Sequence, residues 1–265
     1  MKKKAFVSLC NTGQYRQIVM STVLAIAGLG ANFSAHAAEW SSTNIQLLHG
    51  TDYALIPVGE EKKAIITVEH ANGWKYGDNF FFMDIAKPTA KGTSHYGEYS
   101  PRLSFGKISG KDFSFGVVKD FLLAGTLEVG DGVHATLLGL GIDLKLPGFA
   151  FTQLNIYARK SERDFAATQT DAGGQVTLAW KLPFEVSTQK LAFEGFADYA
   201  FGEDSGSNPK EDNLVAAPRL LIDVGNWFGV AGALQAGVEY QIWRNKFGVD
   251  GVDEDAVQAM VKWIF

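Results

Sequence analysis

Cysteine is nearly absent from this chain of 265 residues, since Cys10 is the only one. Without a second thiol the chain can form no internal disulfide, and it lacks the cysteine pairs that build many zinc sites. Histidine is also scarce: His49, His70, His95 and His134 are scattered after residue 37 without a metal-binding spacing. The nucleophile sequence Gly-x-Ser-x-Gly does not occur. We therefore expect no metal, no cofactor and no enzyme activity.

Long hydrophobic runs are missing as well. After residue 37 no stretch is apolar over the roughly 20 residues that a membrane-spanning helix needs. Before it, basic residues at positions 2–4 and Arg16 lead into a shorter apolar run, Ile18 to Gly30, and Ala35-His36-Ala37 fits the small-x-small cleavage pattern. The sequence thus predicts a cleavable signal peptide over residues 1–37, with an uncleaved N-terminal membrane anchor as the alternative.

Positive charge is scarce in the predicted mature domain, residues 38–265. Removing the four basic residues of the leader leaves 20 Lys and Arg against 29 Asp and Glu, a net charge of −9. An acidic surface disfavours the phosphate backbone of nucleic acid as a partner. No linker divides these residues, so we expect them to form one domain.

The mature domain is rich in segments whose every second residue is apolar or aromatic. In residues 149–160, for example, Leu154 and Ile156 alternate with Asn155 and Tyr157. A period of two indicates strands with one face against an apolar phase, although a soluble sandwich alternates in the same way. About twelve such segments follow one another, near residues 41–48, 64–70, 80–86, 96–106, 113–128, 134–146, 149–159, 175–182, 191–201, 213–224, 230–244 and 257–265.

The connections between these segments differ in length. Longer ones fall mostly after odd-numbered segments, at 49–63, 160–174, 202–213 and 245–256, and shorter ones after even-numbered segments. Long loops on one rim and short turns on the other are typical of outer-membrane barrels. The pattern favours a barrel over a soluble sandwich.

The final segment ends in an aromatic residue. Val257, Val261, Trp263 and Phe265 lie on one face, and Gln258 lies on the other. A terminal aromatic on an amphipathic last strand resembles the signal by which the bacterial barrel assembly machinery recognises its substrates; an ordinary edge strand is the alternative. Together with the export signal, this predicts an all-β fold: a transmembrane, antiparallel, up-and-down β-barrel of about 12 strands in the outer membrane of a Gram-negative bacterium. Every strand edge must then be paired, because hydrocarbon offers no hydrogen bonds.

Alternation also predicts which side chains face the lumen. If Val68, Phe81, Ile85 and Leu103 face lipid, the residues between them face inward. Rings beside polar groups suit a ligand with a flat π-face and hydrogen-bonding edges, such as a nucleobase. The alternative is that the inward charges pair across strands and only rigidify the barrel. The candidate substrate-binding residues are Glu69, Phe80, Phe82, Asp84, Glu98 and Arg102.

Parts of these segments resemble the Tsx-type family of nucleoside-specific outer-membrane channels. Residues 99–116 contain Tyr-Ser-Pro-Arg-Leu-Ser-Phe and end in Asp-Phe-Ser-Phe-Gly, similar to the family's Pro-Arg-x-Ser segment and the sequence after it. Residues 68–84, from Val-Glu-His through Trp74 to Phe-Phe-Phe-Met-Asp, resemble its acidic residue, turn and aromatic run. A third similar stretch runs from Leu138 to Asp143 and on to residues 155–157. Val117 stands where the family's pattern has proline.

The resemblance implies a monomeric barrel through which nucleosides diffuse, weakly held by lumen aromatics and ionisable groups. Members of such families also serve as phage or colicin receptors through their loops. The predicted function is therefore passive, substrate-selective diffusion of nucleosides, with outer-membrane lipid as the other partner. The alternatives are a channel for other small solutes and a structural or receptor barrel with a plugged lumen.

Overall fold

The structure is a computed structural model that describes residues 38–265 except 56–58, 90–91, 164–169 and 204–209. Residues 38–265 form one compact unit. The predicted signal peptide, residues 1–37, lies outside the described residues. In the described part of the chain, no helix is long and apolar enough to cross a membrane.

Antiparallel strands dominate this unit. They are β1 (Trp40–Ala54), β2 (Glu60–Trp74), β3 (Gly77–Pro88), β4 (Ser94–Ser104), β5 (Val118–Gly130), β6 (Val133–Leu144), β7 (Phe151–Arg163), β8 (Gly173–Val186), β9 (Gln189–Phe201), β10 (Asn213–Ala216), β11 (Arg219–Asp223), β12 (Leu234–Arg244) and β13 (Glu254–Ile264). Strands that follow each other along the chain pair, except β10 and β11.

Two of the labelled strands are halves of one barrel strand. β10 and β11 both pair with β9 on one side and β12 on the other. They are interrupted at Ala217-Pro218, where proline has no N–H to donate to the ladder. Hydrogen bonds from Ala217 N to Phe196 O (3.0 Å) and from Tyr240 N to Pro218 O (2.9 Å) carry the pairing across the break. The barrel therefore has the twelve strands that the alternation predicts.

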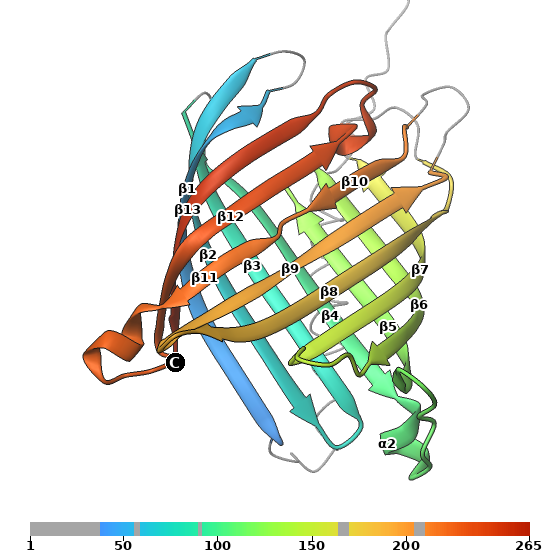
Figure 1. The fold of residues 1–265 in the computed structure, drawn as a ribbon. Helices are drawn as coiled ribbons and strands as arrows, with labels where there is room; N and C mark the ends of the chain where they lie inside the picture. Colours follow the sequence, from blue (N-terminus) through green and yellow to red (C-terminus); the bar gives the residue numbers. More distant parts are fainter. Residues whose placement is uncertain (1–37, 56–58, 90–91, 164–169, 204–209) are drawn as a thin grey trace, which may run out of the picture. The chain divides into compact units, whose positions relative to one another are not determined.

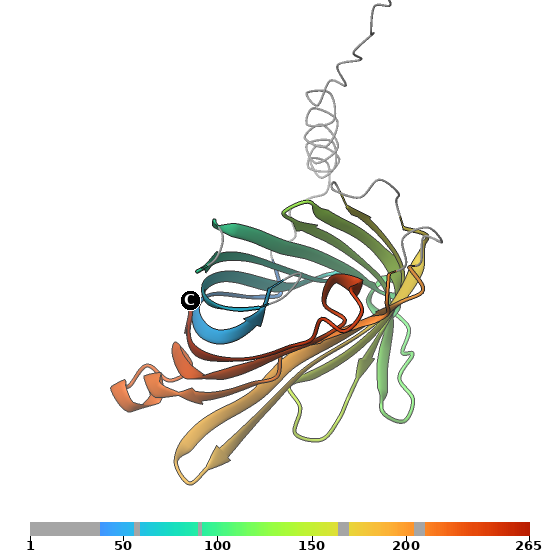
Figure 2. The same cartoon turned by 90° about the horizontal axis from the view of Figure 1, so that it is seen from above.

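The sheet closes on itself. β13 pairs with β1 from Asn44↔Ile264 to Gly50↔Gln258, so no strand is left at an edge. Figures 1 and 2 show the curved sheet returning until the last strand lies beside the first. This confirms the predicted all-β, antiparallel, up-and-down barrel.

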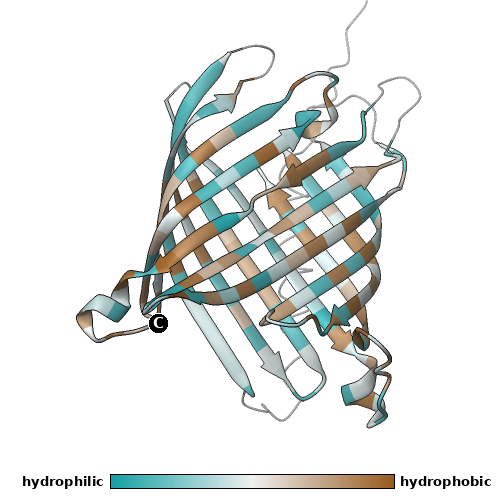
Figure 3. Ribbon diagram, in the orientation of Figure 1, coloured by the Kyte–Doolittle hydropathy of each residue, from teal (hydrophilic) through white to brown (hydrophobic). Residues whose placement is uncertain are grey.

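The barrel is apolar outside and polar inside. On β13, Val257 and Trp263 are 57% and 60% exposed, whereas Gln258 between them is fully buried in the lumen. Figure 3 shows hydrophobic and hydrophilic residues alternating along the strands of the wall. The inward polar faces of the strands position the candidate site.

The predicted loop lengths are wrong in three places, two of them on the rim that carries the C-terminus. The segment 49–63 is mostly strand, because β1 and β2 continue as a hairpin to the pairs Tyr53↔Glu61 and Ala54↔Glu60. The apolar alternation ends earlier than the pairing, since most residues at the end of this hairpin are polar, although Tyr53 is buried there. On the rim that carries the C-terminus, residues 105–117 form a long connection with a short helix, α2 (Phe105–Ser109), instead of a short turn.

Local signals explain this helix. The Ser104 side chain accepts a hydrogen bond from Lys107 N at 2.9 Å, as a helix N-cap does. Gly110 ends the helix with a φ of +67°, a conformation that glycine adopts at little cost. A second long connection on the same rim, residues 224–233, contains the short helix η2 (Val224–Phe228). The rim that carries the C-terminus is therefore not made of short turns alone.

Candidate ligand-binding lumen

Five of the six predicted site residues lie together on one wall of the lumen. β2, β3 and β4 are neighbours, and their register places Glu69, Phe82 and Glu98 in one row across the three strands. The next row contains Asp84, and the row on the other side contains Phe80. The outward residue Phe81, by contrast, is exposed on the lipid face.

Aromatic rings form a ladder along this wall. The ring centroids of Phe80 and Phe82 are 6.0 Å apart with an interplanar angle of 41°, and those of Phe82 and Tyr96 are 5.8 Å apart at 53°. These spacings fall in the range of direct aromatic contact. Tyr96 was not among the predicted residues, although its parity on β4 is that of Glu98 and signals an inward side chain.

Three lumen carboxylates bond to neutral hydroxyl groups. Thr67 Oγ1 donates to Asp84 at 2.5 Å, and Tyr96 OH donates to Glu98 at 2.7 Å. Thr177 donates to Asp198, on β9, in the same way. Within the described part of the chain, none of the three carboxylates has a lysine or arginine at ion-pair distance. Each keeps lone pairs that could accept further hydrogen bonds.

Glu69 belongs instead to an ion-pair network that crosses the lumen. Its carboxylate lies 3.6 Å from Arg219 Nη1 and 3.9 Å from Lys262 Nζ. Arg219 Nε also bonds to Glu239. Because β2 and β11 are not neighbours in the sheet, the contact between Glu69 and Arg219 runs through the interior and not along the wall.

The network continues from Lys262 to two further strands. Lys262 Nζ lies 2.7 Å from Glu194 on β9, and Lys181 Nζ on β8 lies 2.9 Å from the same carboxylate. Three cations and three carboxylates therefore balance each other. Arg219, Glu239 and Lys262 each alternate with apolar residues along their strands, but their partners lie on strands far apart in the chain.

Arg102 lies apart from the row of Glu69 and Glu98. Its guanidinium donates two parallel hydrogen bonds of 2.8 Å to Asp78 and a third of 2.9 Å to Asp143. Bidentate bonding of this kind fixes an arginine side chain firmly. Arg102 thus pairs across strands, as the structural alternative expects, but with Asp78 and Asp143 and not with Glu69 or Glu98. Arg102 instead ties β4 to β3 and β6 near the C-terminal rim.

A second buried arginine was missed by the sequence prediction. Arg159, on β7, donates to Glu128 through both terminal nitrogens, with Nη2 at 2.8 Å, and to Gln175 at 2.8 Å. Its Nε lies 3.2 Å from Glu203, which Lys210 also contacts. Burial raises the pKa of the Glu203 carboxyl, but the hydrogen bond and charge of Lys210 outweigh burial and hold that pKa below its ordinary value.

An apolar strip runs along the inner face of β11, β13, β1 and β2. Leu221, Met260 and Leu48 are at most 6% exposed and pack together, with Ile65 beside them. Gly237 lies between Leu221 and Met260 in the register, and its missing side chain leaves them room to meet. The lumen is thus lined by both apolar and charged side chains.

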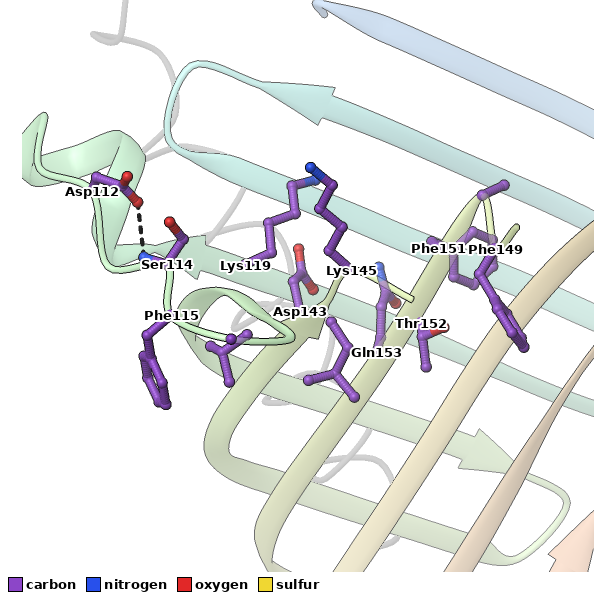
Figure 4. A pocket seen from close by; sticks show the side chains of 14 residues that line it. Asp112, Ser114, Phe115, Lys119, Asp143, Lys145, Phe149, Phe151, Thr152 and Gln153 are labelled. Atoms are coloured by element: carbon purple, nitrogen blue, oxygen red, sulfur yellow. Dashed lines mark hydrogen bonds between the residues drawn. The ribbon is translucent and has the colours of Figure 1, made fainter. Parts of the chain in front are cut away.

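A cavity of about 720 Å³ opens at the C-terminal rim. Its lining includes Lys119, Lys145 and Asp143, which Figure 4 shows together with the Phe149–Gln153 segment. Asp112 lies at its margin, and hydrogen bonds from Ser114 lower the pKa of this exposed carboxyl. Asp143 connects the cavity to the Arg102 cluster. In the described residues, no group of three or more His, Cys, Asp or Glu side chains could hold a metal ion.

Comparison with known proteins places the barrel in a family. The model of the family "Nucleoside-specific channel-forming protein, Tsx" matches residues 35–259. The chain belongs to this family. The resemblance predicted from residues 68–84 and 99–116 is therefore confirmed. As a member of a channel-forming family with a closed barrel, the protein resides in the outer membrane of a Gram-negative bacterium.

Curated relatives are similar over part of their length. The outer membrane protein OmpK of Vibrio parahaemolyticus serotype O3:K6 is 26% identical over 163 residues, 54% of this chain and 59% of that protein. The nucleoside-specific channel-forming protein Tsx of Salmonella typhimurium is 26% identical over 147 residues, 51% of each chain. The chain thus spans about half the length of the curated relatives it matches. Among solved structures, a KdgM porin is 10% identical with a TM-score of 0.47, covering 84% of this chain and 99% of that one.

Proposed function

We propose that this protein is a passive, substrate-selective channel for nucleosides. The observation that carries the proposal is the ladder of Phe80, Phe82 and Tyr96 beside the carboxylates of Asp84 and Glu98. Aromatic rings are not favoured on the wall of a water-filled lumen, whereas a nucleobase can stack on them. The name of the Salmonella typhimurium relative, a nucleoside-specific channel-forming protein, agrees with this proposal.

The two halves of a nucleoside would use different groups. A base stacked on Phe80 or Phe82 gains roughly 1–3 kcal/mol per contact. Asp84 and Glu98 already accept hydrogen bonds from hydroxyl groups of Thr67 and Tyr96, so ribose hydroxyls can take the remaining lone pairs. Binding of this size is weak enough for the solute to leave, as diffusion through a channel requires.

Glu69 and Arg102 have supporting roles in this proposal. Glu69 borders the ring ladder through its register with Phe82, while the network of Arg219 and Lys262 holds its carboxylate. Arg102 is held by Asp78 and Asp143 and lines the lumen near the C-terminal rim. We further propose a monomer that the barrel assembly machinery recognises through the strand ending in Phe265. A phage or colicin receptor role of the loops remains a proposal from family resemblance.

Single-channel recording in planar bilayers tests the proposal. Adenosine or uridine should block the open-pore current of the wild-type protein, and Phe82→Ala should weaken this block about fivefold or more, because one stacking contact is lost. Phe81→Ala is the matched control, since Phe81 is the next residue on β3 and faces lipid. Unchanged block in Phe82→Ala, or a wild-type current that never responds to nucleosides, would overturn the proposal.

A barrel with a plugged lumen is the second candidate. The ion-pair network from Glu69 to Lys181 and the buried Leu221–Met260 strip favour it, because both fill interior space. The same recording separates the two functions: a plugged barrel gives no open-pore current at all, whereas a channel conducts before any nucleoside is added.

A further inference from the structure

The connection at residues 224–233, between β11 and β12, exposes large apolar side chains. Phe228 is 75% exposed, Trp227 60% and Val230 53%. Among the large hydrophobic residues that the structure describes, Phe228 is the most exposed. We refer to these residues as the 224–233 loop. Figure 1 shows it projecting sideways from the wall beside the C-terminus.

Hydrogen bonds hold the 224–233 loop in this projecting shape. The Asp223 carboxylate accepts from Asn226 N at 3.2 Å and from Gly232 N at 2.8 Å, bridging the two ends of the loop. Val230 N donates to Gly225 O at 3.0 Å, and Gly229 turns the chain with a φ of +77°. The apolar side chains are thus presented on a built scaffold.

A neighbouring turn fixes the orientation of the indole. Trp227 Nε1 donates to Gln189 Oε1 at 2.5 Å, and Gln189 Nε2 donates to Asp223 O at 3.1 Å. The polar end of the Trp227 side chain therefore points at the protein, while 60% of the residue stays exposed. This leaves an aromatic surface without a protein partner.

The uncovered surface is continuous with the lipid-facing wall. Ile264 N donates to Ala233 O at 2.8 Å, which joins the end of the loop to β13. On β13, Trp263 and Phe265 are 60% and 69% exposed, and their rings stack at 5.9 Å with an interplanar angle of 9°. The chain carries no charged residue from 224 to 238. Nothing in this stretch opposes contact with an apolar phase.

We propose that the 224–233 loop is a lipid-binding element that lies in the boundary between headgroups and acyl chains, with Trp227 and Phe228 inserted into the membrane. Tryptophan and other aromatic side chains favour this boundary in membrane proteins. The occupant is the bilayer and not a protein, because the surface continues the strands that already face lipid and offers no charge pattern for a partner to read. The proposal is independent of the solute that the lumen passes.

Site-directed spin labelling in lipid vesicles tests the proposal. Because Cys10 is the only cysteine, Phe228→Cys in a Cys10→Ser background gives one labelling site. The full-length protein is reconstituted in phosphatidylethanolamine and phosphatidylglycerol, and label collisions are measured with oxygen, which enters lipid, and a nickel chelate, which stays in water. Val238→Cys, on the lipid face of β12, and Asp112→Cys, on an exposed loop of the same rim, are the lipid and water controls.

The expected result is an oxygen-to-nickel accessibility ratio at Phe228→Cys several-fold above that of Asp112→Cys and approaching that of Val238→Cys. A ratio equal to that of Asp112→Cys would place the loop in water and overturn the proposal. Protection from both reagents would mean that protein covers the loop, as a second copy or a partner would, and would overturn it too. If Phe228→Cys does not fold, Val230→Cys on the same loop gives the same measurement.

Discussion

At the scale of single residues, the charged side chains of the lumen fall into two groups. Arg219, Arg102 and Arg159 are each held by more than one carboxylate. Asp84 and Glu98 have only neutral hydroxyl partners among the described residues. The first group is costly to disturb and so maintains structure, while the second keeps lone pairs that we propose accept hydrogen bonds from a solute.

Asp84→Asn should weaken nucleoside block without unfolding the barrel. The amide has nearly the shape of the carboxylate and still accepts from Thr67, but it loses the charge that strengthens a hydrogen bond from ribose. Because hydrogen bonds to charged groups contribute about 1.5–3 kcal/mol, the blocking constant should rise roughly tenfold or more. Single-channel recording measures it, with Asp131→Asn on the exposed β5–β6 turn as control. Equal constants in the two variants would contradict the assigned role.

Arg219→Met should destabilise the folded barrel. It leaves the carboxylates of Glu69 and Glu239 without their shared cation, and breaking a buried pair costs about 3–5 kcal/mol. Urea unfolding in vesicles, followed by tryptophan fluorescence, measures the change in the free energy of unfolding. In the control Arg244→Met, the lost partner is the exposed Asp255, so the cost should be under about 1 kcal/mol. A similar loss of unfolding free energy in both variants would mean that solvent screens the ion pairs of the lumen as it screens those of the surface.

At the scale of elements, the closing strand carries the most consequence. β13 joins β12 to β1, and Phe265 N donates to Thr43 O at 2.9 Å at its very end. Without this strand, β1 and β12 would both present unpaired backbone groups to hydrocarbon. Each such group costs on the order of several kcal/mol. Closure thus depends on the same strand that we propose the assembly machinery recognises.

Deleting Phe265, or making Phe265→Asp, should lower the amount of protein in the outer membrane far more than it lowers secretion. The ring of Phe265 stacks on Trp263, and a charge there would face lipid. Fractionation followed by immunoblotting measures both amounts. Phe115→Asp, which changes an equally exposed ring on a rim loop, is the matched control. Outer-membrane levels of the Phe265 variants that match the control would refute the prediction.

Alternation made the strands and their inward faces predictable from sequence, because a period of two assigns every residue of β2, β3 and β4 to one side. It could not identify partners: Asp143, which holds Arg102, and Arg219, which reaches Glu69, depend on curvature and register around the whole barrel. Helix α2 was not predicted, although its cap residues Ser104 and Gly110 can be read from the sequence, because the alternation placed the end of a strand at residue 106 and a short turn after it. The polar end of the β1–β2 hairpin lacked any apolar period to detect.

At the scale of the whole molecule, closure predicts unusual resistance to detergent. Every barrel strand is paired on both sides, so unfolding must break the entire ring of hydrogen bonds. The unboiled protein should therefore migrate on gels as a compact species, faster than the boiled one, and circular dichroism should report strand and little helix. A truncation lacking residues 254–265 should lose the fast band. Identical migration before and after boiling of the intact protein would contradict a closed barrel.

The ion pairs that cross the lumen brace the barrel, because they connect strands that are not neighbours in the wall. A ring of twelve strands without them could flatten under lateral pressure from the bilayer, since hydrogen bonds along the wall resist stretching better than bending. Arg219 and Lys262 fix the distance between parts of the wall through their contacts with Glu69 on β2 and Glu194 on β9. The width of the passage is then set by the reach of a few side chains. Barrels with the same number of strands can therefore differ in lumen width when shorter or longer residues replace these ion-paired side chains.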